Sequence, residues 1–286
     1  MKPSFLIIGA QKSGTTALAD ALGGHPGVFV CEPREPEYFS HSVRPDRAGM
    51  SWEAYQALFL EAGEDQAGGE ASTGTMLRPD VIPEIDRRLP GVRLIAVLRE
   101  PVGRAYSGMA HDTKKGRVAV GEGAGIFEKE AQAFLAGEDC QFDWFSRSEY
   151  GRQLEPFARH YGERLKIVIF EELIAEQERV LGEVLEFLEL PPAEIALTRE
   201  NTTRVPKGRA TEALVAMGRR VVGPVRRSMS EKGYRKFREG IMQKLGKRIE
   251  PLDPELAGRL RAEGFAEDRE ILKGILGRSV EVWKQG

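Results

Sequence analysis

The N-terminal stretch of the chain constrains its fold most strongly. Residues 5–9 form a continuous apolar run of strand length, and a glycine-rich loop follows directly and ends at Gly14. The apolar residues that come next recur at helical spacing: Ala17, Leu18, Ala21 and Leu22. A glycine-rich turn between a strand and a helix aims backbone N–H groups at one point, where the helix dipole adds partial positive charge. The stretch therefore predicts an anion site at the start of an α/β fold.

The alternation of strands and helices continues to about residue 200. Further strands are expected at 28–31, 92–98 and 165–170, and helices at 52–62, 79–89, from Val102 on, and at 175–188. This order predicts right-handed βαβ units and a three-layer sandwich with a central, mostly parallel sheet. From Ala210 on we find helical patterns only, including an N-terminal cap at Asp253 followed by Pro254. We expect one domain over residues 1–286, with an α/β core in 1–200 and a helical elaboration in 201–286.

The composition excludes several classes of protein. With 41% hydrophobic and 30% charged residues among 286, the chain is expected to be globular, and no apolar run approaches the roughly 20 residues that span a bilayer. The apolar run at the start is too short for a signal peptide, so we expect a cytoplasmic protein. Cys31 and Cys140 lie far apart and no His, Cys or Asp cluster has ligand spacing, so no metal is expected.

Charge is segregated along the chain although the net charge is only −2. Residues 199–248 contain 15 Lys and Arg against 4 Asp and Glu, whereas the rest contains 27 against 40. Such a stretch suits a polyanionic cofactor, an acidic acceptor or peripheral contact with an anionic membrane surface. For a charge run alone, a solvated helical face is the favoured interpretation. We expect no nucleic-acid partner.

The glycine loop resembles the start of a P-loop but departs from it at the key cation. The spacing from Gly9 to Gly14 fits, yet a P-loop has lysine directly after its second glycine, where this chain has Thr15. The lysine, Lys12, stands two residues before Gly14. A nucleotide-dependent kinase would also need a strand-end aspartate for magnesium, and the best strand here ends at Arg99. The loop therefore predicts a P-loop-like fold that binds another phosphate ligand.

Two motifs together resemble PAPS-dependent sulfotransferases, where PAPS is 3′-phosphoadenosine 5′-phosphosulfate. The segment Lys12-Ser13-Gly14-Thr15-Thr16 after an apolar strand is similar to the 5′-phosphosulfate loop of that family. The stretch from Arg99 to Ser107 has the form in which the family reads the 3′-phosphate, an arginine at a strand end and a serine on the next helix. A guanidinium offers phosphate a planar fork of donors. The cofactor-binding residues that this resemblance implies are Gln11, Lys12, Ser13, Gly14, Thr15, Thr16, Arg99 and Ser107.

Other segments are similar to the heparan sulfate N- and O-sulfotransferase branch. The segment Arg34-Glu35-Pro36-Glu37-Tyr38-Phe39 looks like its basic-Glu-x-x-aromatic-Phe segment, in which the glutamate is the proposed base. His111 stands where the N-sulfotransferases carry a functional histidine, so Glu35 is the first candidate base and His111 the second. Glu70, expected at the end of a loop between strands, and His41 are acceptor-site candidates.

The last third adds two further resemblances. The segment Pro206-Lys207-Gly208-Arg209 resembles the loop that closes over the cofactor phosphates, so Lys207, Gly208 and Arg209 are expected to contact the cofactor and exclude water. The tail from Gly277 to Trp283 is like that of bacterial members of the family. The resemblance therefore covers nearly the whole chain, in the expected order.

The activity implied is transfer of a sulfuryl group from PAPS, leaving PAP, to a hydroxyl or amine. Lys12 would stabilise the leaving oxygens, because in-line transfer depends mostly on position and electrostatics. The acceptor stays open among small molecules, lipids and glycans, and loops 40–51 and 112–125 are expected to shape its cleft. The alternatives are a kinase of P-loop type and a non-catalytic module that binds anions or membrane surfaces through residues 199–248.

Overall fold

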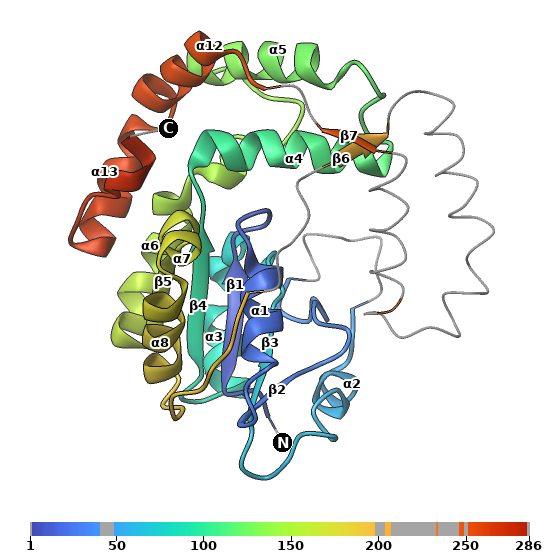
Figure 1. Cartoon of the computed structure of the whole chain (residues 1–286), viewed down its shortest axis with the longest axis vertical. Helices are drawn as coiled ribbons and strands as arrows, with labels where there is room; N and C mark the ends of the chain where they lie inside the picture. Colours follow the sequence, from blue (N-terminus) through green and yellow to red (C-terminus); the bar gives the residue numbers. More distant parts are fainter. Residues whose placement is uncertain are drawn as a thin grey trace, which may run out of the picture. The chain divides into compact units, whose positions relative to one another are not determined.

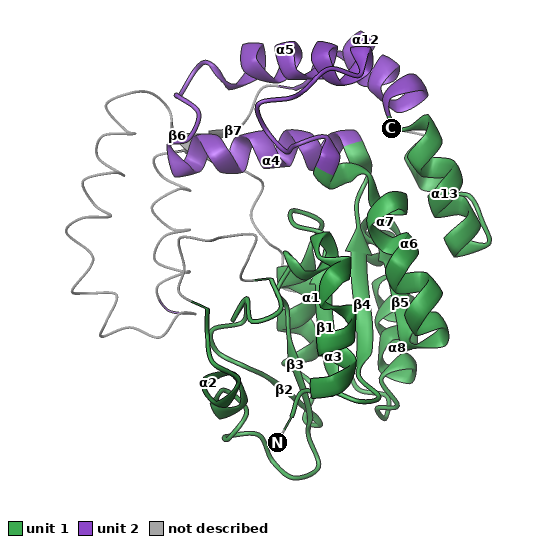
Figure 2. Cartoon of the chain, turned by 180° about the vertical axis from the view of Figure 1, so that it is seen from behind, with its two compact units in different colours: residues 1–101, 147–199, 265–286 green, residues 102–146, 200–264 purple. Residues whose placement is uncertain are grey.

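The computed structural model describes residues 2–40, 49–197, 204–206, 233, 246–248 and 251–284. The chain divides into two compact units (Figure 2). Unit 1 comprises Met1–Pro101, Arg147–Arg199 and Phe265–Gly286, and unit 2 comprises Val102–Ser146 and Glu200–Gly264. In the part of the chain that is described, no helix is long and apolar enough to cross a membrane. The single domain expected over residues 1–286 stays a prediction.

Unit 1 is built on a parallel five-stranded sheet, which confirms the predicted fold class. The strand order is β2-β3-β1-β4-β5, with β1 in the centre (Figure 1). The strands are β1 (Phe5–Gly9), β2 (Val28–Val30), β3 (Ala67–Glu70), β4 (Arg93–Leu98) and β5 (Leu165–Ile169). Four of these were expected, but β3 was not. Glu70 is thus the last residue of a strand, and its expected place in a loop between strands was wrong.

Alternate side chains of the strands face two separate hydrophobic clusters, so helices cover both faces of the sheet. Leu6 and Ile8 of β1 enter one cluster with α3 (Ile82–Arg88) and α6 (Tyr150–Tyr161). Phe5 and Ile7 enter the other with α1 (Thr15–Leu22) and α8 (Gln177–Phe187). This period of two is what a strand imposes, and burial on both faces is typical of parallel sheets.

Several expected helices have different bounds in the structure. The helix expected at 175–188 is α8, and a separate helix that was not predicted, α7 (Phe170–Ala175), precedes it. Glu176 between them has the non-helical backbone angles φ −129° and ψ 52°. The helix expected at 52–62 is the shorter α2 (Trp52–Ala57), which Ser51 caps. A 3-10 turn precedes α3 within 79–89. The later α13 (Ala266–Leu276) packs on α6, where the Asp268 carboxylate accepts the Gly151 and Arg152 N–H groups at 2.9 Å each.

Unit 2 holds all of α4 (Pro101–Lys115) except its first residue, together with α5 (Gly123–Ala136) and α12 (Pro254–Arg259). The buried Trp144 bonds to two residues of α4: its indole N–H donates to Asp112 at 2.9 Å, and its carbonyl accepts from Arg104 at 2.5 Å.

The expected cap of α12 is present, since Asp253 accepts the Leu256 N–H. The expectation of helices only after residue 210 was wrong, because β7 (Gly246–Arg248) pairs antiparallel with β6 (Arg204–Pro206). Helix α5 was not predicted, and α4 extends into the loop expected at 112–125.

We expect Gly69→Ala to destabilise the protein by about 2 kcal/mol, because a Cβ at Gly69 would overlap the buried ring of Phe5 on the neighbouring strand. The matched control is Gly68→Ala, whose Cβ would lie 3.2 Å from Phe59 and should cost clearly less. Urea unfolding of both variants measures the difference. Equal losses at the two positions would show that the close packing of β1 on β3 is not what requires glycine.

Candidate active site

The sheet topology brings the predicted site residues of unit 1 to one edge. β1 pairs in parallel with β3 on one side and with β4 on the other. The loop of Lys12 follows β1, Glu70 ends β3, and Arg99 follows β4. Ligands of open parallel sheets bind outside the carboxyl ends of the strands, at the point where the strand order reverses. The site predicted from sequence motifs therefore coincides with the site that this topology favours.

The glycine loop has the backbone of an anion cradle. Gly14 is the N-cap of α1 with φ 92°, and Lys12 also has a positive φ of 72°. Ser13 is fully buried, and its hydroxyl has no hydrogen-bond partner among the described residues. A buried hydroxyl without a partner costs free energy unless a ligand satisfies it. The loop thus fits a small anion held at the N-terminus of α1.

Phe170, at the start of α7, connects the glycine loop with the arginine after β4. A Cβ at Gly14 would overlap its ring, so only glycine allows the loop to lie this close. On the same ring lies the guanidinium of Arg99, with its Cζ atom 5.6 Å from the ring centroid. No carboxylate of the described ranges, Glu70 and Glu100 included, forms an ion pair with Arg99. The arginine is therefore available to a phosphate.

The segment that carries Glu35 is fixed to the end of β3. The Ala71 N–H donates to the Arg34 carbonyl, and the Glu37 N–H donates to the Ser72 hydroxyl, each at 2.9 Å. Glu35 itself is exposed. The structure thus brings two predicted acidic residues, Glu35 and Glu70, into one neighbourhood beside the phosphate loop.

Arg34 joins the same segment to α1. Its Nη1 atom donates to the Thr16 carbonyl and contacts the Asp20 carboxylate, both at 3.1 Å. Arg34 therefore stabilises the first turn of the helix whose N-terminus forms the cradle. Arg147, which sequence reasoning missed, donates to Gln11 at 3.4 Å and adds a second cation beside the loop. The sequence could not indicate this contact, because residues 11 and 147 are far apart in the chain and share no motif.

Glu70 is the most perturbed acid of the site. It is 1% exposed, and burial raises its pKa to about 8 from the ordinary value of 4.5. Two bonds from Ser72 oppose this shift, one of them the N–H···Oε2 bond of 2.6 Å, whereas the negative charges of Glu35 and Glu37 add to it. A carboxyl in this environment holds a proton at neutral pH, which its sequence position alone did not indicate.

The remaining candidates belong to unit 2 or lie outside the described residues. Ser107, which is buried, and His111, which is half-buried, are one helical turn apart on α4 in unit 2, so their pairing with Arg99 and Glu35 stays a prediction. Lys207, Gly208, Arg209 and His41 lie outside the described residues, as does most of the basic stretch 199–248. Of the described residues, no group of three or more His, Cys, Asp or Glu side chains is arranged to hold a metal ion.

Two further histidines make contacts with other parts of the protein. The His25 ring accepts the Gly27 N–H and contacts the Pro191 carbonyl, both at 2.9 Å, and His160 pairs with Asp86. Three aromatic residues of the segment 144–150 are buried: Trp144, Phe145 and Tyr150.

Comparison with known proteins identifies the family. The model of the sulfotransferase domain matches residues 2–248. The chain belongs to the sulfotransferase domain family. Its relatives include mouse heparan sulfate glucosamine 3-O-sulfotransferase 3A1 and human heparan sulfate glucosamine 3-O-sulfotransferase 3B1. Each is 29% identical over 66% of this chain, and the chain covers 46% of the length of each.

A solved structure supports the same fold. The sulfotransferase from Alicyclobacillus acidocaldarius aligns with a TM-score of 0.71 at 20% identity, covering 99% of both chains. At this identity the likeness bears on the fold alone. The glycine loop and Arg99 follow strands of this shared sheet, and their roles in binding stay predictions.

We expect Gly14→Ala to destabilise the protein by about 3 kcal/mol, because alanine is strained at φ 92° and its Cβ would also overlap Phe170. Gly91→Ala is the matched control, since Gly91 has φ 81° but nothing within 4 Å of the added Cβ. The control should cost only about 1 kcal/mol. Urea unfolding separates the two contributions, and equal costs would mean that the contact with Phe170 is not restrictive.

We expect the free energy of unfolding to fall as the pH rises, because the buried Glu70 loses its proton. Its folded pKa of about 8 lies above the ordinary 4.5, so the stability from its protonated form is complete below pH 4.5 and is lost as pH rises through 8. The loss is on the order of 4 kcal/mol. Glu70→Gln should flatten this slope in urea unfolding between pH 5 and 9, whereas the exposed Glu64→Gln should not. An unchanged slope in Glu70→Gln would assign the pH dependence to other groups.

Proposed function

We propose that this chain transfers the sulfuryl group of PAPS to a hydroxyl or amine of an acceptor. The observation that carries the proposal is the pair of cation sites at the ends of two adjacent strands, the Lys12 loop after β1 and Arg99 after β4. One bisphosphorylated nucleotide has two phosphate groups for two such sites. A nucleoside triphosphate has no 3′-phosphate for Arg99, and Thr15 stands where a kinase loop has its lysine.

The residues of the site fit PAPS. Backbone N–H groups of Gly14, Thr15 and Thr16 at the N-terminus of α1 would hold the 5′-phosphate, and the Ser13 hydroxyl would gain the partner it lacks among the described residues. Arg99, supported by the Phe170 ring, would hold the 3′-phosphate, with Ser107 as the second predicted ligand. Lys207, Gly208 and Arg209 are proposed to close over the phosphates.

When bound, PAPS supplies a sulfuryl group on a bisphosphate leaving group. The charge that develops on the leaving oxygens requires a fixed cation, and we assign this role to Lys12. Water competes with the acceptor, so a site of this kind must also limit access of solvent. The chain's own contribution is to position and stabilise charge, and no described residue needs to form a covalent intermediate.

The acceptor must lose a proton, and Glu35 is the proposed base. Its exposure suits a residue that meets an incoming acceptor, and its attachment to β3 keeps it beside the loop. Glu70 is less suited, because a carboxyl with a pKa of about 8 is mostly protonated at neutral pH and is buried. His111 remains the second candidate.

The acceptor class that the relatives support is a glycan. The named relatives are heparan sulfate glucosamine 3-O-sulfotransferases, which modify a sugar hydroxyl. We therefore propose a saccharide hydroxyl, ahead of a lipid or another small molecule. The cytoplasmic location and the peripheral contact through residues 199–248 stay predictions.

The first test is a thermal shift with PAP, 5′-AMP and ATP with magnesium. A ligand at 100 times its dissociation constant adds about 2.7 kcal/mol to stability, so PAP alone should raise the midpoint clearly. Arg99→Ala should lose most of this shift. Arg93→Ala, at the opposite end of β4, is the matched control and should keep it.

Two outcomes would contradict the proposal. Stabilisation by ATP with magnesium but not by PAP would support the kinase alternative. A PAP shift that survives Arg99→Ala would remove the 3′-phosphate role of that arginine. If PAP binds as expected, sulfate transfer from radiolabelled PAPS to glycan, lipid and phenol acceptors then tests the acceptor class.

A further inference from the structure

The C-terminal tail, which sequence analysis singled out, is seated on unit 1 beside the turn of Arg99. Trp283 is 7% exposed and belongs to the hydrophobic cluster that also contains Tyr150. The two rings lie 6.1 Å apart between their centroids. The tail is therefore attached through the hydrophobic core as well as through surface contacts.

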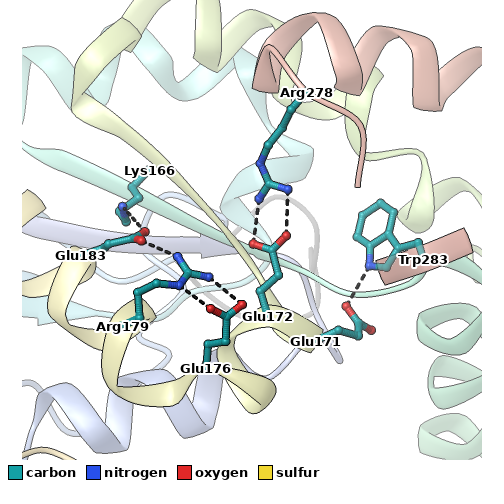
Figure 3. A network of polar contacts seen from close by, with 8 residues as sticks. All are labelled: Lys166, Glu171, Glu172, Glu176, Arg179, Glu183, Arg278 and Trp283. Carbon is teal, nitrogen blue, oxygen red and sulfur yellow. Dashed lines mark hydrogen bonds and ion pairs between the residues drawn. The ribbon is translucent and has the colours of Figure 1, made fainter. Parts of the chain in front are cut away.

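The indole of Trp283 makes a directed polar contact as well. Its Nε1–H donates to Oε2 of Glu171 at 2.8 Å, and Figure 3 shows the two side chains pointing toward each other. Glu171 lies in α7, directly after Phe170. A neutral N–H that donates to a carboxylate forms a stronger bond than a neutral pair.

Glu171 uses its other oxygen on the turn that follows β4. Oε1 accepts the Glu100 N–H at 3.0 Å, so one carboxylate bridges Trp283 and the residue next to Arg99. The carbonyl of Arg99 accepts the Tyr150 hydroxyl at 2.9 Å. Both polar groups of the Arg99–Glu100 peptide are thus held, the carbonyl by Tyr150 and the N–H by Glu171, and Trp283 contacts both of these side chains.

A second tail contact offers an internal comparison. Arg278 donates to both oxygens of Glu172 at 2.8 and 2.7 Å (Figure 3). This pair joins the same tail to the same helix, but its side chains are 50% and 22% exposed. Among the described residues, Glu172 forms no hydrogen bond or ion pair with the turn of Arg99.

We propose that Trp283 and Glu171 are positioning residues that orient Arg99 toward the 3′-phosphate of the donor nucleotide. The inference rests on the proposed function, since it concerns the affinity for PAP. Bonds at Glu100 and at the Arg99 carbonyl restrict the backbone from which the guanidinium extends. An arginine that is already oriented loses less conformational entropy when it binds phosphate.

The test compares the dissociation constants of PAP and 5′-AMP by titration calorimetry. Because 5′-AMP lacks the 3′-phosphate, the ratio of the two constants isolates that group. Trp283→Phe keeps an aromatic ring but removes the N–H donor, and we expect it to weaken PAP about tenfold and 5′-AMP hardly at all. Glu171→Gln removes one of two acceptors and should act in the same direction. Arg278→Gln is the matched control and should change the ratio less than about twofold.

A double-mutant cycle completes the test. If Trp283 acts through Arg99, Trp283→Phe should weaken PAP binding no further in an Arg99→Ala background.

An unchanged ratio of the PAP and 5′-AMP dissociation constants in both Trp283→Phe and Glu171→Gln would overturn the inference and leave the proposed function standing. If Arg278→Gln changed the ratio equally, the effect would come from the attachment of the tail in general, and the inference would be overturned. A wild-type protein that does not prefer PAP to 5′-AMP would instead refute the proposed function. Thermal midpoints of the free proteins show whether each variant is folded.

Discussion

Parallel pairing of β1 with β3 and β4 is the constraint on which the site depends. It places three strand ends side by side, and each end contributes a different chemical group: a backbone cradle, a buried carboxyl and a guanidinium. None of these groups is close to another in the sequence. The close packing of Phe5 against Gly69 keeps β1 and β3 in register, so packing inside the sheet determines where the polar groups at its edge lie.

Phe170 and Glu171 give the end of β5 a role that its own sequence does not suggest. The ring of Phe170 lies against both Gly14 and the Arg99 guanidinium, and Glu171 holds the peptide after Arg99. One short segment thus contacts both proposed phosphate sites. Rigid support of this kind stabilises the geometry that a doubly charged ligand requires, because less order has to be created on binding.

The sequence predicted those parts of the site that depend on local patterns. The strand of residues 5–9 and the loop after it follow from apolar runs and glycine spacing, and Arg99 follows from the end of a strand. The strand β3 was missed because Ala-Gly-Gly-Glu has no apolar run, and its glycines are explained only by contact with a distant ring. The contact of Trp283 with Glu171 and the raised pKa of Glu70 depend on residues far apart in the chain, so no local pattern could indicate them.

The residues that bond to the turn of Arg99 are synthesised at different times. A chain is synthesised from its N-terminus, so the loop of Lys12 and the strand that ends before Arg99 both emerge from the ribosome before Tyr150 and Glu171. A nascent chain that stops between residues 107 and 150 contains both proposed phosphate-binding motifs without the groups that hold the second. Trp283 joins later still. The support of the Arg99 turn therefore comes from segments made at different times, and it is complete only when Trp283 contacts Glu171 and Tyr150.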